Sequence, residues 1–358
     1  MSSYASGMNQ QTLDHYRIAY ETTFNHLVQQ HESRFGDKGI IKPAEGQATR
    51  FNQYGVRSFT AKTARTGATQ LSDSSLPVRW AYSFPFEDAL AFDEYDQLFL
   101  GDIVLPTSAS MQSQVFAWNR MKDDVFLANI LGLGYKSTAS SGNTGYTGGG
   151  GIVPPIVPVP FQSANVVSNT FVPFGGTAVT SGMTIAKIRR AKRIMDGNEV
   201  PEQGRYLALT GKELEDLLAT TEVTNNLYGT VGALVDGKVN HFLGFEIIRS
   251  ERLPYYNASS EANYATNYTN SGVPNVFGIS GSFTTATYNN LTDISSTGIK
   301  SCVAWQKDMV GIIDGGRKSY MDILPTLSHT LQIRSTGVSG AARLQENGVV
   351  AILSDQNA

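Results

Sequence analysis

The chain has 358 residues, with 28 Lys or Arg against 31 Asp or Glu, and charged residues make up only 16% of it. The net charge of −3 argues against a dedicated nucleic-acid or membrane-surface binder, because such proteins normally carry a strong basic excess. An apolar fraction of 41% excludes disorder of the whole chain, since disorder needs low hydrophobicity and high charge. A weakly charged surface rich in Ser, Thr, Gly and Tyr favours a subunit that is covered by its neighbours.

Cys302 is the only cysteine, so the chain can form neither an internal disulfide nor a thiolate cluster for zinc or iron–sulfur. No apolar run approaches the roughly 18 residues that a membrane span needs. Residues 1–11 (MSSYASGMNQQ) lack the basic and apolar regions of a secretory signal. We therefore expect an intracellular protein with no membrane partner.

The residue pattern of the N-terminal quarter changes at Gly46. Between Gln11 and His31 apolar residues recur in a partly helical pattern, which suits an arm that docks onto other elements. From Gly46 to Arg79, strand-like alternation at Thr49–Phe51 and Val56–Phe59 is punctuated by glycine and serine. This stretch has too few large apolar residues for a core of its own. We predict a two-stranded excursion that projects from the body and is stable only when laid on another surface.

The clearest helix is predicted at Thr107–Leu131, and Gly132 and Gly134 end it. At 1.5 Å per residue it would be about 36 Å long, enough to span a whole domain. The apolar residues that recur at spacings of three and four are Met111, Val115, Trp118, Met121, Val125 and Ala128. We predict that Val115, Trp118 and Val125 lie on its buried face.

Two shorter helices and a strand-rich end follow a glycine- and proline-rich stretch at 137–160, which cannot be helical. One helix is predicted at Thr184–Asp196, with Ile185, Ile188 and Met195 inward and Gly197 as its stop. The other begins at the capping box Thr210–Glu213. A Tyr- and Asn-rich stretch, Tyr255–Asn290, reads as a long surface excursion. Strands are predicted at 244–248, 301–305, 310–313, 330–334 and 349–353.

No catalytic, cofactor or metal site is predicted, and we expect a protein that is not an enzyme. The acidic clusters Glu87–Asp88 and Asp93–Asp96 could supply paired carboxylates, but such residues are common in turns and before helices. The five histidines show no spacing that would put two ligands on one helix face. The Gly148–Gly151 tract lacks the following Lys-Ser/Thr of a phosphate-binding loop.

Five cations fall within the predicted helix 184–196. They indicate a solvated or salt-bridged face, an intersubunit contact, or a patch that faces phosphate. The five are Lys187, Arg189, Arg190, Lys192 and Arg193.

The order of these predicted elements resembles that in the major capsid protein of tailed double-stranded DNA bacteriophages, which has the Hong Kong 97-type α+β fold. An amphipathic arm, a long β-excursion, a single long helix, a mixed domain and a closing strand pair follow one another. The stretches that add to the resemblance are RFNQYGV…RTGATQLSDSSLPVRW, GRYLALTGKELEDLL, FLGFEIIRSERLP, VAWQKDMVGIID and HTLQIRSTGVSGAARLQENGVVAIL.

The resemblance implies a division of the chain into named parts. The N-terminal arm would be 1–39 and the extended E-loop 45–80. The peripheral (P) domain would be 81–182 with 319–358, carrying the spine helix 107–131. The axial (A) domain would be 183–318. The E-loop residues expected at contacts between subunits are Arg50, Phe51, Arg57, Phe59, Lys62 and Arg65.

The resemblance also implies a structural role in the virion. Subunits would assemble in the host cytoplasm, as hexamers and pentamers, into an icosahedral or prolate head around non-specifically bound double-stranded DNA. Because the arm begins almost at Met1, a separate scaffolding protein is implied, together with a portal. Lys62 is the only lysine between Lys42 and Lys122, but nothing in the sequence identifies a partner for a covalent crosslink.

Three alternatives remain open from the sequence. An encapsulin-type shell protein shares the fold, and its cargo would be an enzyme in place of DNA. A tail-tube or decoration protein would also be rich in β structure, although the long helix argues against it. A hydrolase that uses the acidic clusters would keep its activity as a monomer.

Overall fold

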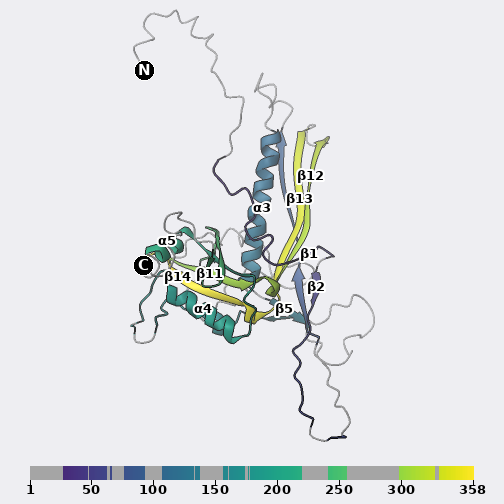
Figure 1. Cartoon of the computed structure of the whole chain (residues 1–358). Helices are drawn as coiled ribbons and strands as arrows, with labels where there is room; N and C mark the ends of the chain where they lie inside the picture. The colour runs from purple at the N-terminus through teal and green to yellow at the C-terminus, as the bar shows by residue number, and fades with distance from the viewer. Residues whose placement is uncertain are drawn as a thin grey trace, which may run out of the picture.

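The computed structural model describes residues 27–46, 48–62, 65–66, 76–92, 107–132, 134–137, 156–159, 161–173, 176, 178–219, 241–255, 298–326 and 330–358. The strands of this part of the chain form three sheets. A long helix runs beside a long hairpin, and two shorter helices flank a separate sheet (Figure 1). Most of the predicted arm, the acidic cluster 93–96, the glycine-rich loop and nearly all of 255–290 lie outside the described residues.

The long helix, α3 (Thr107–Leu131), has the bounds that the sequence predicts. It packs along β13 (Thr330–Arg343). The ring of Trp118 occupies the space above Gly337, where an added Cβ would lie 2.4 Å from Trp118 Cη2. The predicted stripe is confirmed only in part: Val125 is buried, whereas Val115 and Trp118 are half-buried. The helix is buried most completely in its last two turns, where the sheets meet.

The long sheet has the order β1-β12-β13-β4. Its centre is the antiparallel hairpin of β12 (Val310–Leu324) and β13. The short strand β1 (Ile40–Pro43) runs parallel to β12 and covers only Gly311–Asp314. On the other side β4 (Phe84–Phe92) pairs with β13 and forms the edge of the described sheet.

The six-stranded sheet has the order β7-β14-β11-β8-β10-β9 and contains most of the core. Every residue of β8 and of β11 is buried, and the helix α4 (Ile185–Gly197) packs on β14. The strands are β7 (Val166–Val167), β14 (Val349–Asp355), β11 (Ile299–Gln306), β8 (Arg205–Leu209), β10 (Phe245–Arg249) and β9 (His241–Phe242).

The predicted division of the chain needs correction at its C-terminal end. The segment 319–358 was assigned to one domain, but β14 pairs with β11 in the six-stranded sheet. Conversely, residues 310–318, assigned to the other domain, form the first part of β12 in the long sheet. Alternation and apolar content predict that a segment is a strand, but its sheet is decided by pairing with residues far away in the sequence.

The small sheet, β2-β3-β5-β6, holds the root of the predicted excursion. The strand predicted at Thr49–Phe51 is confirmed within β2 (Ala48–Asn52), which pairs with β3 (Val78–Tyr82). The strand predicted at Val56–Phe59 is not found among the described strands, since residues 53–62 belong to no helix or strand there. The sheet is completed by β5 (Gly134–Ser137) and β6 (Ile156–Val159).

Both short helices begin as the sequence predicts. Thr184 is the N-cap of α4, and its side chain accepts a hydrogen bond from the Lys187 N–H at 3.3 Å. In α5 (Gly211–Ala219) the Glu213 carboxylate reaches back to the Thr210 N–H at 2.9 Å, which is the reciprocal bond of a capping box. Helix α4 continues through Gly197, one residue beyond the predicted end.

Candidate interaction surfaces

Lys187, the first cation of the predicted basic patch, is buried on the inner face of α4. Its ammonium group donates hydrogen bonds to the carbonyl oxygens of Ser181 at 2.7 Å, Gly182 at 2.8 Å and Leu353 at 3.1 Å. Burial lowers the pKa of Lys187 to about 8, because desolvation disfavours the charged form. Lys187 therefore ties α4 to β14 and cannot face DNA, which corrects its place in the patch.

The sequence did contain a signal for this burial. Lys187 lies next to Ile188 and four residues before Ala191, both of which are buried, so it falls on the edge of the inward stripe of the helix. The three carbonyl acceptors, by contrast, come from a turn and from a strand about 170 residues away. Only the fold brings them to one point.

The other four cations of α4 differ in exposure. Arg189 and Arg193 are exposed, while Arg190 and Lys192 are half-buried. The guanidinium of Arg190 lies 5.9 Å from the centroid of the Phe171 ring. Because Arg189 and Arg193 are four residues apart, they share one face of the helix. These two side chains are the best candidates on α4 for a contact with phosphate or with a neighbouring subunit.

Asp123 anchors the last described part of the arm, residues 27–39, to α3. Its carboxylate accepts hydrogen bonds from Ser33 Oγ at 2.6 Å and from the backbone N–H groups of Arg34 at 3.0 Å and Phe35 at 3.2 Å. The side chain of Gln30 also donates to it. These four donors offset the cost of burying the Asp123 carboxylate away from water.

This anchored segment inserts an aromatic ring into the main core. Phe35 packs against Phe126 at 5.3 Å and against Trp305 at 5.8 Å between ring centroids. The indole N–H of Trp305 donates to the Lys38 carbonyl oxygen at 2.9 Å. Sequence reasoning missed Asp123, because a carboxylate within Lys122-Asp123-Asp124 looks like part of a solvated face.

Phe51, predicted at an intersubunit contact, is buried within its own chain with 3% of its surface exposed. It packs with Ile313 and Leu344. Gly311 leaves room for the ring, since an added Cβ there would lie 2.6 Å from Phe51 Cζ. Phe51 therefore holds the root of the excursion against its own chain. Its predicted role at an intersubunit contact is corrected.

Beyond this root, the excursion exposes apolar side chains that contribute nothing to the core. Tyr54 is 69% exposed, Val56 102% and Phe59 106%. Arg50, Arg57, Lys62 and Arg65 are exposed on the same segment. In Figure 1 the extended part of this segment runs away from the three sheets. This row of exposed apolar residues on an extended segment is therefore a candidate interaction surface.

The acidic pair Glu87–Asp88 does not form a carboxylate dyad. The two residues are consecutive in β4, so their side chains point to opposite faces of the sheet. Glu87 pairs with Arg334 at 2.6 Å on an exposed surface. Within the described residues, these carboxylates therefore lack the enclosed, convergent arrangement that acid–base chemistry requires.

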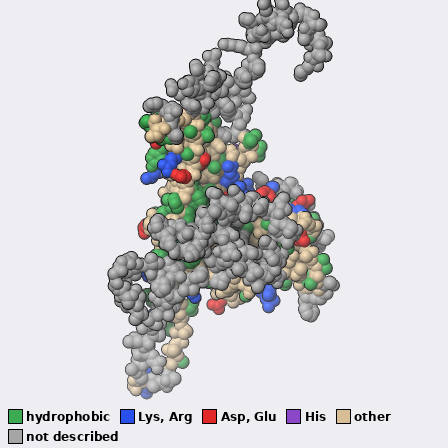
Figure 2. Space-filling view, turned by 180° about the vertical axis from the view of Figure 1, so that it is seen from behind, with side chains coloured by type: hydrophobic (Ala, Val, Ile, Leu, Met, Phe, Trp, Pro, Cys, Tyr) green, Lys and Arg blue, Asp and Glu red, His purple; other side chains and the backbone are tan. Residues whose placement is uncertain are grey.

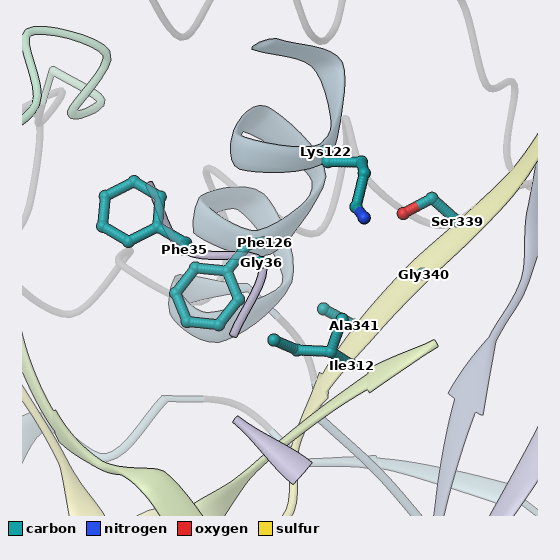
Figure 3. A pocket seen from close by; sticks show the side chains of 8 residues that line it. All are labelled: Phe35, Gly36, Lys122, Phe126, Ile312, Ser339, Gly340 and Ala341. Carbon is teal, nitrogen blue, oxygen red and sulfur yellow. The ribbon is translucent and has the colours of Figure 1, made fainter. Parts of the chain in front are cut away.

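Two cavities lie against the long sheet. The smaller, about 10 Å³, is enclosed by Phe35, Phe126 and Ile312, with Lys122 and Ser339 directed toward each other across it (Figure 3). It can hold about one water molecule. The larger, about 570 Å³, is an open hollow lined partly by Glu87 and Arg334 at the bulge in β12.

The described residues contain neither a candidate metal site nor a candidate membrane span. No group of three or more His, Cys, Asp or Glu side chains in this part of the chain could hold a metal ion. Nor does any helix there have the length and apolar character needed to cross a membrane.

Arg343 joins α3 to two sheets. Its buried guanidinium donates to the carbonyl oxygens of Ile130 at 2.7 Å and Gly132 at 2.8 Å, at the C-terminal end of α3, and to Val159 of β6 at 3.2 Å. It also pairs with Glu346, which lies 3.3 Å from Arg79 at the root of the excursion. A cation at this end of the helix is favoured by the helix dipole. The direction in which the excursion leaves the body is thus set by buried contacts.

Comparison of the whole fold with solved structures gives matches along nearly the full chain. The capsid structure of cyanophage P-SCSP1u is 16% identical, with a TM-score of 0.63, and the match covers 95% of this chain and 93% of that one. The capsid of cyanophage Pam1 is 12% identical, with a TM-score of 0.62 and 99% of each chain covered. The head of Helicobacter pylori bacteriophage KHP40 is 12% identical, with a TM-score of 0.62, and covers 98% and 99%. These likenesses establish an α+β capsid fold.

Sequence comparison gives the family. No curated protein sequence matches the chain. The family described as phage capsid protein, however, matches residues 13–356. The chain therefore belongs to the phage capsid protein family and is a structural subunit, the major capsid protein, of a phage head shell.

Proposed function

We propose that the subunit follows the Hong Kong 97-type division of labour and assembles as hexamers and pentamers. The long sheet with α3 would act as the peripheral domain, and the six-stranded sheet with α4 and α5 as the axial domain. Residues 45–80 would be the E-loop, and 27–39 the end of the N-terminal arm. The corrected strand assignments support this division, since β12 and β13 accompany α3 while β14 joins the other sheet.

The observation that carries the proposal is the excursion. The root of this segment is held by Phe51, but Tyr54, Val56 and Phe59 are exposed and bury little apolar surface within their own chain. An apolar segment of this kind is stabilised when neighbouring subunits bury it. The proposed intersubunit residues are therefore Phe59 with Arg50, Arg57, Lys62 and Arg65, together with Tyr54 and Val56.

The exposed cations of α4 support a second, weaker contact. Arg189 and Arg193 would either bind packaged DNA through its phosphates, without reading its sequence, or make ion pairs with a neighbouring subunit. Replacing both by Gln separates these roles. If empty shells form normally but DNA-filled shells come apart at a lower salt concentration, the two arginines contact DNA. If empty shells no longer form, the two arginines lie at a subunit interface.

The remaining partners rest on the family resemblance. A separate scaffolding protein and a portal would join the assembly in the host cytoplasm. The chain would act as a structural protein without catalysis. An encapsulin-type shell remains the alternative with the same fold, and it predicts enzyme cargo where a phage head contains DNA.

Electron microscopy of the expressed protein tests the proposal directly. The chain, alone and with the products of its neighbouring genes, should form closed shells built from rings of five and six subunits. Nucleic acid in the shells would support a phage head, and an enclosed enzyme would support the encapsulin-type alternative. Monomers under every condition would contradict the proposed assembly.

A further inference from the structure

Two adjacent strands of the six-stranded sheet continue directly into two adjacent strands of the long sheet. The chain passes from β11 to β12 through η4 (Lys307–Met309), a short turn of 3₁₀-helix. It returns from β13 to β14 through a second such turn, η5 (Glu346–Gly348). The long hairpin and α3 stand as a column on the broader part of the molecule, as Figure 1 shows and as Figure 2 shows from behind. Both of these crossings can therefore bend where the column meets the rest of the subunit.

The two turns lie against each other. The Leu344 N–H, just before η5, donates to the Met309 carbonyl oxygen at 2.8 Å. An added Cβ at Gly348 would overlap Met309 Cγ, so the glycine leaves room for the opposite turn. Regular pairing stops at Trp305 in the six-stranded sheet and resumes at Val310 in the long sheet. Because pairing is interrupted in both segments at the same level, a change in a few backbone dihedrals there tilts one sheet against the other.

Residues 37–43, termed the splint, contact both sides of this interruption. On the six-stranded sheet, the Trp305 indole N–H donates to the Lys38 carbonyl oxygen at 2.9 Å. On the long sheet, β1 pairs in parallel with β12. Only Gly39 separates Lys38 from β1, and an added Cβ at Gly39 would lie 2.9 Å from the Val310 carbonyl oxygen. The splint therefore has no slack at the point where it passes η4.

We propose that η4 and η5 form a hinge between the long sheet and the six-stranded sheet, and that the splint sets the angle at which this hinge rests. The inference rests on the proposed assembly into rings of five and six, because one chain must then fit two different curvatures. Phe35, two residues before the splint, is held in the main core, so the splint connects that core directly to β12. A short connection of fixed length across a hinge determines its angle. The splint therefore acts on the curvature of the shell and not on the fold of either sheet.

Electron cryomicroscopy of shells of the unaltered protein tests the hinge. Subunits from rings of five and from rings of six are superposed on their long sheets. The six-stranded sheets should then differ by a rotation whose pivot lies at η4 and η5, and the hydrogen bond from Trp305 to Lys38 should differ in length between the two rings. Equal angles in the two rings, or a pivot elsewhere in the chain, would overturn the hinge. Failure of the unaltered protein to form shells would instead overturn the proposed function itself.

Two substitutions test the splint separately. Gly39→Ala pushes the splint away from Val310, and Lys38→Met removes the ammonium group that lies 3.4 Å from the Glu246 carboxylate. Each should raise the fraction of shells with an altered diameter by about fivefold, because losing one interaction of hydrogen-bond size shifts a two-state equilibrium by about that factor. The matched control is Gly197→Ala, whose added Cβ projects into open space, and it should leave the diameters unchanged. Unchanged diameters in both variants, with unfolding curves that show folded subunits, would overturn the role of the splint.

Discussion

The six-stranded sheet and the excursion are opposite solutions to the problem of burying apolar side chains. In the sheet, β8 and β11 are buried along their whole length, and Trp305 has 0% of its surface exposed. In the excursion, Val56 and Phe59 are as exposed as in an extended chain. We therefore expect the stability of the sheet to be built into the subunit, and that of the excursion to depend on assembly. Substitutions in the two regions should therefore separate folding from shell formation.

Trp305→Ala should have the largest effect on folding. The indole packs against Phe35, Phe126 and Tyr206 and donates to the Lys38 carbonyl oxygen. Truncating a core aromatic costs about 3 to 5 kcal/mol of unfolding free energy. Denaturant unfolding of isolated subunits measures the loss, with Trp305→Phe as a milder control. An unchanged midpoint would show that this cluster is not the core of the subunit.

Lys187 should make the stability of the folded subunit depend on pH. Its pKa in the folded state is about 8, against 10.5 for the unperturbed group, so between these values the unfolded chain binds more protons. The unfolding free energy should therefore rise with pH across this window, on the order of 3 kcal/mol in total. Lys187→Met should remove this component. The difference in unfolding free energy between the two proteins should change between pH 8 and pH 10.5. Taking this difference removes the contribution of Tyr135, whose pKa burial raises to about 12, because Tyr135 titrates in both proteins. A constant difference would contradict the expectation.

Asp123→Ala should weaken the anchor of residues 27–39 by an intermediate amount. The substitution leaves the Ser33 hydroxyl and the Arg34 and Phe35 N–H groups without their acceptor. Leaving buried donors unsatisfied costs about 1 to 3 kcal/mol. Chemical unfolding gives the loss, and faster proteolysis within 27–39 locates it. Glu32→Ala, at an exposed neighbouring position, is the control and should show neither effect.

Phe59→Ala should have the smallest effect on folding and a large one on assembly. The ring is fully exposed, so the free energy of unfolding should change by no more than about 0.5 kcal/mol. The yield of shells should fall, because the side chain would be buried only between subunits. Unfolding curves and electron microscopy of the same preparation compare the two. A destabilised subunit would mean that the excursion packs on its own chain.

The sequence predicted local structure better than it predicted partners. The bounds of α3, the start of a helix at Thr184 and the capping box at Thr210–Glu213 depend on signals contained within a few turns of helix, and the structure places all three within one residue of the prediction. The sheet that β14 joins depends on β11, about 50 residues earlier, and no local pattern encodes that choice.

The candidate surfaces show the same limit. Charge identified the basic residues of α4, but the burial of Lys187 depends on carbonyl groups that tertiary structure supplies. Phe51 and Phe59 are both phenylalanines in a core-poor stretch, yet one is buried and the other exposed. What separates them is the space left by Gly311, a residue 260 positions away.

The parallel pairing of β1 with β12 has a consequence for the timing of biosynthesis. Ile40–Pro43 must wait for Gly311–Asp314, which are made about 270 residues later. At ribosomal speeds of about 5–20 residues per second, the wait is about 15 to 50 seconds. The six-stranded sheet is completed later still, because its strand β14 ends at Asp355. A nascent chain therefore displays its excursion before the body that orients it exists, and premature association on the polysome is the hazard that this topology creates.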